Sequence, residues 1–169
     1  MPIEKQFIAI YTILRKGVVR IIRIWSQTLL PSIVTSVLYF AVFGNILGSR
    51  IGTLNGVPYI LFVVPGLVML AVITNSYMDV ATSFFVSKFF SRNSHEILLS
   101  PTPPSVIIAG FIASGVIRGM LVGILVMIVS LFFALPSIVH PLVVLLFLFL
   151  SSLVFALGGL INGIYAKSF

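Results

Sequence analysis

Residues 142–165 read LVVLLFLFLSSLVFALGGLINGIY, a run without one charged side chain. About 20 consecutive apolar residues in a helix are enough to cross the hydrocarbon core of a bilayer. The stretch therefore predicts a membrane-spanning helix, and Lys167 marks its end.

Three further apolar stretches precede it, at residues 28–48, 59–80 and 105–135. The last is longer than a crossing requires, so we expect it to tilt or to protrude. Composition agrees, because 8% of the residues are charged, against about 25% in soluble domains. We predict an all-α integral membrane protein with four transmembrane helices, in which residues 1–169 form a single transmembrane domain.

The basic residues predict the orientation of these spans. Only Arg50 lies in a loop between the first and second spans. The cations before the first span, between the second and third spans, or after the fourth span all lie on the other side of the membrane, and these are Lys5, Arg15, Lys16, Arg20, Arg23, Lys88, Arg92 and Lys167. Because cytoplasmic loops carry the excess of Lys and Arg, the N-terminus is predicted to be cytoplasmic. Attraction to anionic lipid explains the net charge of +7 more simply than nucleic-acid binding does.

Residues 5–25 have helical periodicity with two distinct faces. One face is basic and comprises Lys5, Lys16, Arg20 and Arg23, whereas the other is apolar and comprises Phe7, Tyr11, Leu14, Val18, Ile21 and Trp25. This pattern predicts an amphipathic helix at the membrane surface, with its cations toward the headgroups. The helix is either an anchor alone or also a contact for a cytoplasmic partner.

A second short helix is predicted at residues 93–100, between the second and third spans. Asn93 followed three residues later by Glu96 forms a capping-box pattern, and Pro101 prevents the helix from continuing. A helix this short is not stable alone, so its apolar residues Ile97 and Leu98 need a packing partner.

Three polar residues near or within the spans are candidates for lining a translocation path. Arg118 lies in the middle of the third span, while Asn75 and Asp79 share one face near the inner end of the second. Arg118 either lines the path or has a structural role. Direct pairing with Asp79 is not expected, since Arg118 is about 14 residues, or ~20 Å, from the inner end of its own span.

Glycines at positions 115, 119 and 123 recur every fourth residue, so they share one helix face. Such a face lets a neighbouring backbone approach closely, and we expect it to serve packing within the subunit.

The sequence does not favour an enzyme. His95 and His140 are predicted on opposite sides of the membrane, and the three acidic residues form no plausible catalytic pair. There is no cysteine, no zinc-binding helix pattern and no glycine-rich nucleotide loop. If ATP is used, another chain must bind it, and this chain is expected to hold no cofactor or metal.

Three motifs carry a resemblance to a known family: VPGLV at residues 64–68, EILLSPTP at residues 96–103, and Arg118-Gly119. With the basic N-terminal helix, this arrangement resembles the permease subunits of type-two ABC exporters, which move polysaccharides, lipids and drugs across the bacterial inner membrane.

The resemblance implies that residues 93–100 are a coupling helix that docks on a separate ATP-binding subunit, which would hold ATP and Mg. The contact residues would be Arg92, His95, Glu96, Ile97 and Leu98. Two permease copies, expected to be a homodimer, would form the substrate path. Such permeases have six spans, so two spans beyond this chain are expected. The alternatives are a secondary transporter or channel, or a membrane scaffold that transports nothing.

Overall fold

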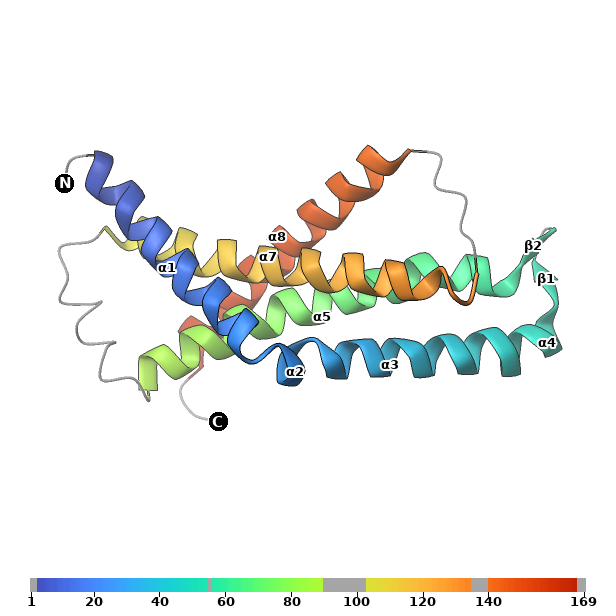
Figure 1. Ribbon diagram of the computed structural model, residues 1–169. Helices are drawn as coiled ribbons and strands as arrows, with labels where there is room; N and C mark the ends of the chain where they lie inside the picture. The colour runs from blue at the N-terminus through green and yellow to red at the C-terminus, as the bar shows by residue number, and fades with distance from the viewer. Residues whose placement is uncertain (1–2, 55, 90–102, 135–139, 167–169) are drawn as a thin grey trace.

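The computed structural model describes residues 3–54, 56–89, 103–134 and 140–166 (Figure 1). Its elements in chain order are α1 (Ile3–Arg23), α2 (Trp25–Thr28), α3 (Leu30–Ala41), the π-helix η1 (Val42–Leu47), α4 (Gly48–Ile51), β1 (Thr53–Leu54), β2 (Val57–Pro58), α5 (Tyr59–Phe89), α7 (Pro104–Ser130) and α8 (Pro141–Tyr165).

Four helices within the described ranges are long and apolar enough to cross a membrane, namely Trp25–Ile51, Tyr59–Ser87, Pro104–Ser130 and Pro141–Tyr165. The predicted all-α membrane fold is therefore confirmed. The first crossing is assembled from α2, α3, η1 and α4 rather than from one regular helix. It continues into a short antiparallel hairpin of β1 and β2, where Gly52 and Gly56 adopt positive φ angles of 71° and 81°.

Helices α3, α5 and α7 run lengthwise through the molecule, and α1 and α8 cross them obliquely (Figure 1). Helix α5 contacts both α7 and α8, and α1 packs mainly on α7. At one end of the bundle α7 begins, α5 ends and α1 lies across them.

The apolar core has two parts along the length of α5. One part includes Val72, Val122 and Leu148, and the other includes Val80 and Val116. Between them, at the level of Ser76 and Ser152, the helices touch through small residues, and both serine side chains are fully buried.

Close approach of the helices depends on glycine, as the sequence predicted for positions 115, 119 and 123. A Cβ atom on Gly119 would collide with the hydroxyl of Ser76 and would stand 3.2 Å from the Cβ of Ser152. A Cβ on Gly159 of α8 would collide with the backbone carbonyl of Tyr77. Packing within the subunit is thus confirmed as the role of the glycine face.

The second and third spans end at different residues from those predicted. Helix α5 continues nine residues beyond position 80, to Phe89. The polar residues there do not end the helix, because Thr82 and Ser83 donate hydrogen bonds to the carbonyls of Met78 and Asp79 one turn earlier. Helix α7 ends at Ser130 rather than 135.

Candidate functional site

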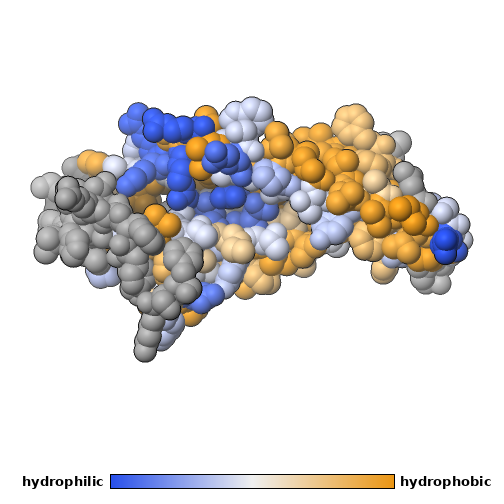
Figure 2. Space-filling model, turned by 90° about the horizontal axis from the view of Figure 1, so that it is seen from below, coloured by the Kyte–Doolittle hydropathy of each residue, from blue (hydrophilic) through white to orange (hydrophobic). Residues whose placement is uncertain are grey.

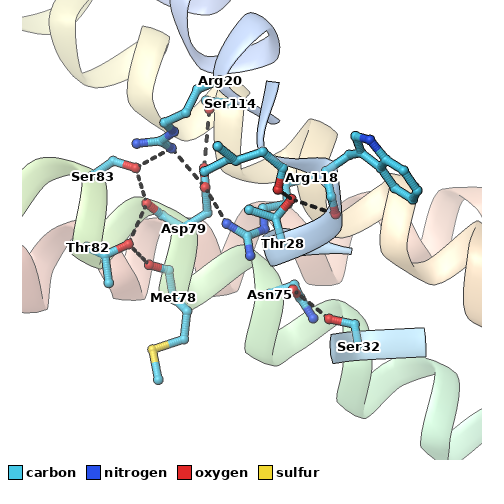
Figure 3. Close-up of polar contacts among 12 residues, drawn as sticks. Arg20, Thr28, Ser32, Asn75, Met78, Asp79, Thr82, Ser83, Ser114 and Arg118 are labelled. Carbon is cyan, nitrogen blue, oxygen red and sulfur yellow. Dashed lines mark hydrogen bonds and ion pairs between the residues drawn. The ribbon is translucent and has the colours of Figure 1, made fainter. Parts of the chain in front are cut away.

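The carboxylate of Asp79 on α5 is the centre of a buried polar cluster, with a side chain that is 1% exposed. Its Oδ1 accepts hydrogen bonds of 2.9 Å from Arg20 Nη2 of α1 and of 2.9 Å from Arg118 Nη1 of α7. Ser114 Oγ of α7 donates to Oδ2 at 3.2 Å (Figure 3). One carboxylate therefore connects three helices.

Ser83 completes this arrangement. Arg20 Nη2 also donates to Ser83 Oγ at 2.6 Å, and the Ser83 hydroxyl donates to the backbone carbonyl of Asp79 (Figure 3). The five residues Arg20, Asp79, Ser83, Ser114 and Arg118 are called the Asp79 cluster below.

The Asp79 cluster holds two guanidinium groups against one carboxylate, so it carries one excess positive charge. Asp79 is also the only acidic residue whose side chain lies in the described part of the structure. An arginine in the centre of a span costs about 2.5 to 3.5 kcal/mol on insertion scales. Pairing with Asp79 offsets part of that cost for Arg118, whose side chain is 17% exposed.

The direct pairing of Asp79 with Arg118 corrects the expectation from the sequence. The error came from placing Asp79 at the end of its helix. Because α5 continues to Phe89, Asp79 lies ten residues from the helix end, and Arg118 lies fourteen residues from Pro104, where α7 begins. These separations correspond to ~15 Å and ~21 Å along the two axes, a difference that a long arginine side chain spans.

Arg20 also differs from its prediction as a membrane-surface residue. It turns inward to Asp79 and its side chain is 42% exposed. Lys16 and Arg23 are exposed, and their place at the membrane surface stays a prediction. The side chain of Lys5 lies outside the described residues. The reason is the packing of α1 on α7, which brings Arg20 within reach of the buried carboxylate of Asp79.

The apolar face predicted for the N-terminal helix is only partly the face that packs. Phe7 and Tyr11 are 69% and 64% exposed, whereas Ile21 is 2% exposed. Helix α1 contacts α7 through Gly17, where a Cβ would collide with Ser114, and through Ile13, which lies 2.6 Å from a Cβ built on Gly110. Small residues at this crossing therefore decide which side of α1 faces the bundle.

A groove of about 340 Å³ lies between α3 and α5. Its polar lining consists of Ser32, Thr35, Ser36, Tyr39, Thr74 and Asn75. Ser32 Oγ donates to Asn75 Oδ1 at 3.2 Å (Figure 3). Asn75 Nδ2 donates to the carbonyl of Ala71 at 2.9 Å. We call this feature the α3–α5 groove. Asn75 thus bonds to α3, whereas Asp79 one turn later bonds to α1 and α7.

Sequence reasoning missed Ser32, Ser83 and Ser114. A usable signal exists for two of them, since Ser83 follows Asp79 by four residues and Ser114 precedes Arg118 by four. Side chains four apart share a helix face, so polar pairs at this spacing in apolar helices mark a common buried surface.

The residues predicted for the coupling helix lie outside the described residues, and these are Arg92, His95, Glu96, Ile97 and Leu98. Helix α5 ends at Phe89 just before this segment, and α7 begins at Pro104 just after it. Among the side chains that can be described, no three of His, Cys, Asp or Glu gather to hold a metal ion.

Comparison with known proteins matches residues 8–169 to the family described as ABC-2 type transporter. The inner membrane transport permease YadH of Escherichia coli K12 is 51% identical over 164 residues, which cover 96% of this chain and 63% of that protein. The same figures hold for the YadH permeases of Escherichia coli O157:H7 and Shigella flexneri. The chain thus spans less than two thirds of the curated relatives it matches. No solved structure matched the chain.

Proposed function

Because this chain belongs to the ABC-2 type transporter family, we propose that it is the membrane permease part of an ATP-driven exporter in the bacterial inner membrane. Two copies form the substrate path, and a separate subunit binds ATP and Mg. The relatives named as inner membrane transport permeases and the four helices suited to crossing a membrane support this proposal.

The observation that carries the mechanism is the connection of three helices through Asp79. Helices α5 and α7 flank residues 90–102, and Asp79 links both of them and α1 by hydrogen bonds of 2.9 to 3.2 Å. A displacement of the 90–102 segment is therefore transmitted to α1, α5 and α7 together. Packed helices move as rigid bodies in such transitions, because their interfaces are not continuously deformable.

Helix α5 also lines the α3–α5 groove, through Thr74 and Asn75. The groove offers hydroxyl and amide groups within helices that are otherwise apolar. We assign the groove to the substrate path. This assignment extends the prediction that Asn75 lines the path. Asp79 and Arg118 then support the path by holding α5 in position. The side chain of Arg118 is 17% exposed.

In this mechanism closure of the ATP-binding subunits pushes the coupling helix at residues 93–100. The push moves α5 relative to α3, which changes the α3–α5 groove and exposes it alternately to the two sides. The exposed cations Arg15, Lys16 and Arg23 support a cytoplasmic N-terminus, since basic residues collect on that side.

A secondary transporter fits less well. Such proteins bind coupling ions at open polar sites near the midplane. Both oxygens of Asp79 are already engaged by Arg20, Arg118 and Ser114, so this carboxylate is not open to a coupling ion.

The test is recovery of the ATP-binding subunit with the tagged full-length permease. Leu98→Arg places a charge on the apolar side of the proposed coupling helix and should reduce the recovered subunit about tenfold or more, as for a buried interface anchor. Arg50→Gln, in α4 at the far end of the first crossing from α1, is the control and should leave recovery unchanged. Equal recovery with both variants would contradict the assignment of residues 93–100.

A further inference from the structure

A second cavity, of about 210 Å³, lies between α1, α5 and α7 beside the Asp79 cluster. The polar residues that line it are Lys16, Arg20, Ser83, Ser87 and Ser114. None of the described lining residues is acidic. We call this cavity the basic pocket.

The charge balance next to the basic pocket is positive. Asp79 is shared between Arg20 and Arg118, so among the described side chains one of the two guanidinium charges has no carboxylate of its own. Arg20 donates to Asp79 and Ser83 through Nη2, lines the pocket, and has 42% of its side chain exposed. Lys16, which is exposed, adds a further charge.

The surface around this end of the molecule has the same character. Hydrophilic side chains gather over the half that carries α1, while the other half is mostly apolar (Figure 2). Phe7 and Tyr11 of α1 are 69% and 64% exposed, as expected for side chains that contact lipid at a membrane surface. The basic pocket thus lies beside α1, and an amphipathic helix at the membrane surface contacts both lipid headgroups and the cytosol.

We propose that the basic pocket binds a phosphate group. A guanidinium fork suits phosphate because it offers parallel N–H donors, and an ammonium group adds a mobile point charge. Ser87 also lines the pocket and carries a hydroxyl that can donate to an anion. The group belongs either to the headgroup of an anionic phospholipid or to a soluble phosphate ester, and both share this chemistry. Occupation of the pocket would compensate the excess charge at the point where α1, α5 and α7 meet.

The first experiment measures ligand binding to the full-length protein in phosphatidylcholine nanodiscs at physiological salt, by native mass spectrometry. One arm adds phosphatidylglycerol to the bilayer and the other adds soluble glycerol 3-phosphate. Lys16→Gln should weaken the bound ligand about fivefold, the factor equivalent to roughly 1 kcal/mol for one basic residue near a lipid surface. Arg15→Gln, an exposed neighbour outside the pocket lining, is the control and should change binding less than twofold.

A second pair of variants leaves the charge unchanged. Ser87→Leu fills part of the basic pocket and should reduce binding at least fivefold, whereas Thr82→Leu, on the exposed side of the same helix, should not. A loss confined to the phosphatidylglycerol arm identifies a lipid, and a loss confined to the glycerol phosphate arm identifies a soluble ester. Equal binding by Ser87→Leu and Thr82→Leu, or equal effects of Lys16→Gln and Arg15→Gln, would overturn the proposal.

Discussion

Replacing Asp79 with asparagine keeps the shape of the side chain and removes its charge. Arg118, with 17% of its side chain exposed, would then lose its counter-ion within the bundle, and Arg20, with 42% exposed, would lose its own. Breaking a buried ion pair from one side costs about 3 to 5 kcal/mol, whereas an exposed pair contributes roughly 0 to 1 kcal/mol. Because both arginines keep some access to water, we predict that D79N lowers the free energy of unfolding by roughly 3 kcal/mol.

The partner variant Arg118→Gln is predicted to be milder. Asp79 keeps its bond to Arg20 and the cluster becomes electrically neutral, so the loss should be roughly 1 kcal/mol for one hydrogen bond. In the double variant Arg20 is the guanidinium left without a counter-ion, and with 42% of its side chain exposed it keeps contact with water. The loss in the double variant should therefore also be roughly 1 kcal/mol, rather than the sum of roughly 4 kcal/mol that independent sites would give.

The assay is unfolding of the full-length protein in mixed micelles by SDS, followed by circular dichroism for the wild type, both single variants and the double variant. Arg15→Gln, on the exposed side of α1, is the control and should stay within about 0.5 kcal/mol of the wild type. The reasoning is refuted if D79N costs less than R118Q, or if the two losses add.

Three further predictions address packing, the groove and topology. Gly159→Ala should destabilise the protein by about 1 to 3 kcal/mol in the same assay, because the new methyl meets the carbonyl of Tyr77, whereas Gly158→Ala has 4.0 Å of clearance and should be neutral or stabilising. Asn75→Leu removes the contact with α3 in the groove, so cargo-stimulated ATP hydrolysis by the reconstituted complex should fall several-fold while recovery of the ATP-binding subunit is unchanged; full stimulation would argue against a path there. Since the printed sequence has no cysteine, Arg15→Cys and Arg50→Cys report topology directly: an impermeant maleimide should label the first only from the cytoplasm and the second only from outside, and the reverse pattern would invert the orientation.

Local properties of the chain accounted for most of the fold. Each span is an apolar run long enough to cross a bilayer, and this depends on length and composition alone, so the all-α architecture with four crossings followed from the sequence. The glycines at positions 115, 119 and 123 share a face by helical geometry, and their packing role needed no knowledge of which helix lies opposite.

Contacts between polar residues could not be predicted from the sequence, because they depend on how the helices are placed relative to one another. Whether Asp79 meets Arg118 is determined by how far α5 and α7 slide past each other, and its bond to Arg20 depends on the oblique crossing of α1, which Gly17 permits. The end of α5 was likewise not predicted correctly. Its polar residues do not end the helix, because a hydroxyl such as that of Thr82 bonds to a carbonyl one turn earlier, and α5 continues to Phe89. The sequence by itself determined which segments enter the membrane, since burial of apolar surface is a property of each segment. Only the tertiary structure decided which charges are paired, since that requires the relative height and rotation of several helices.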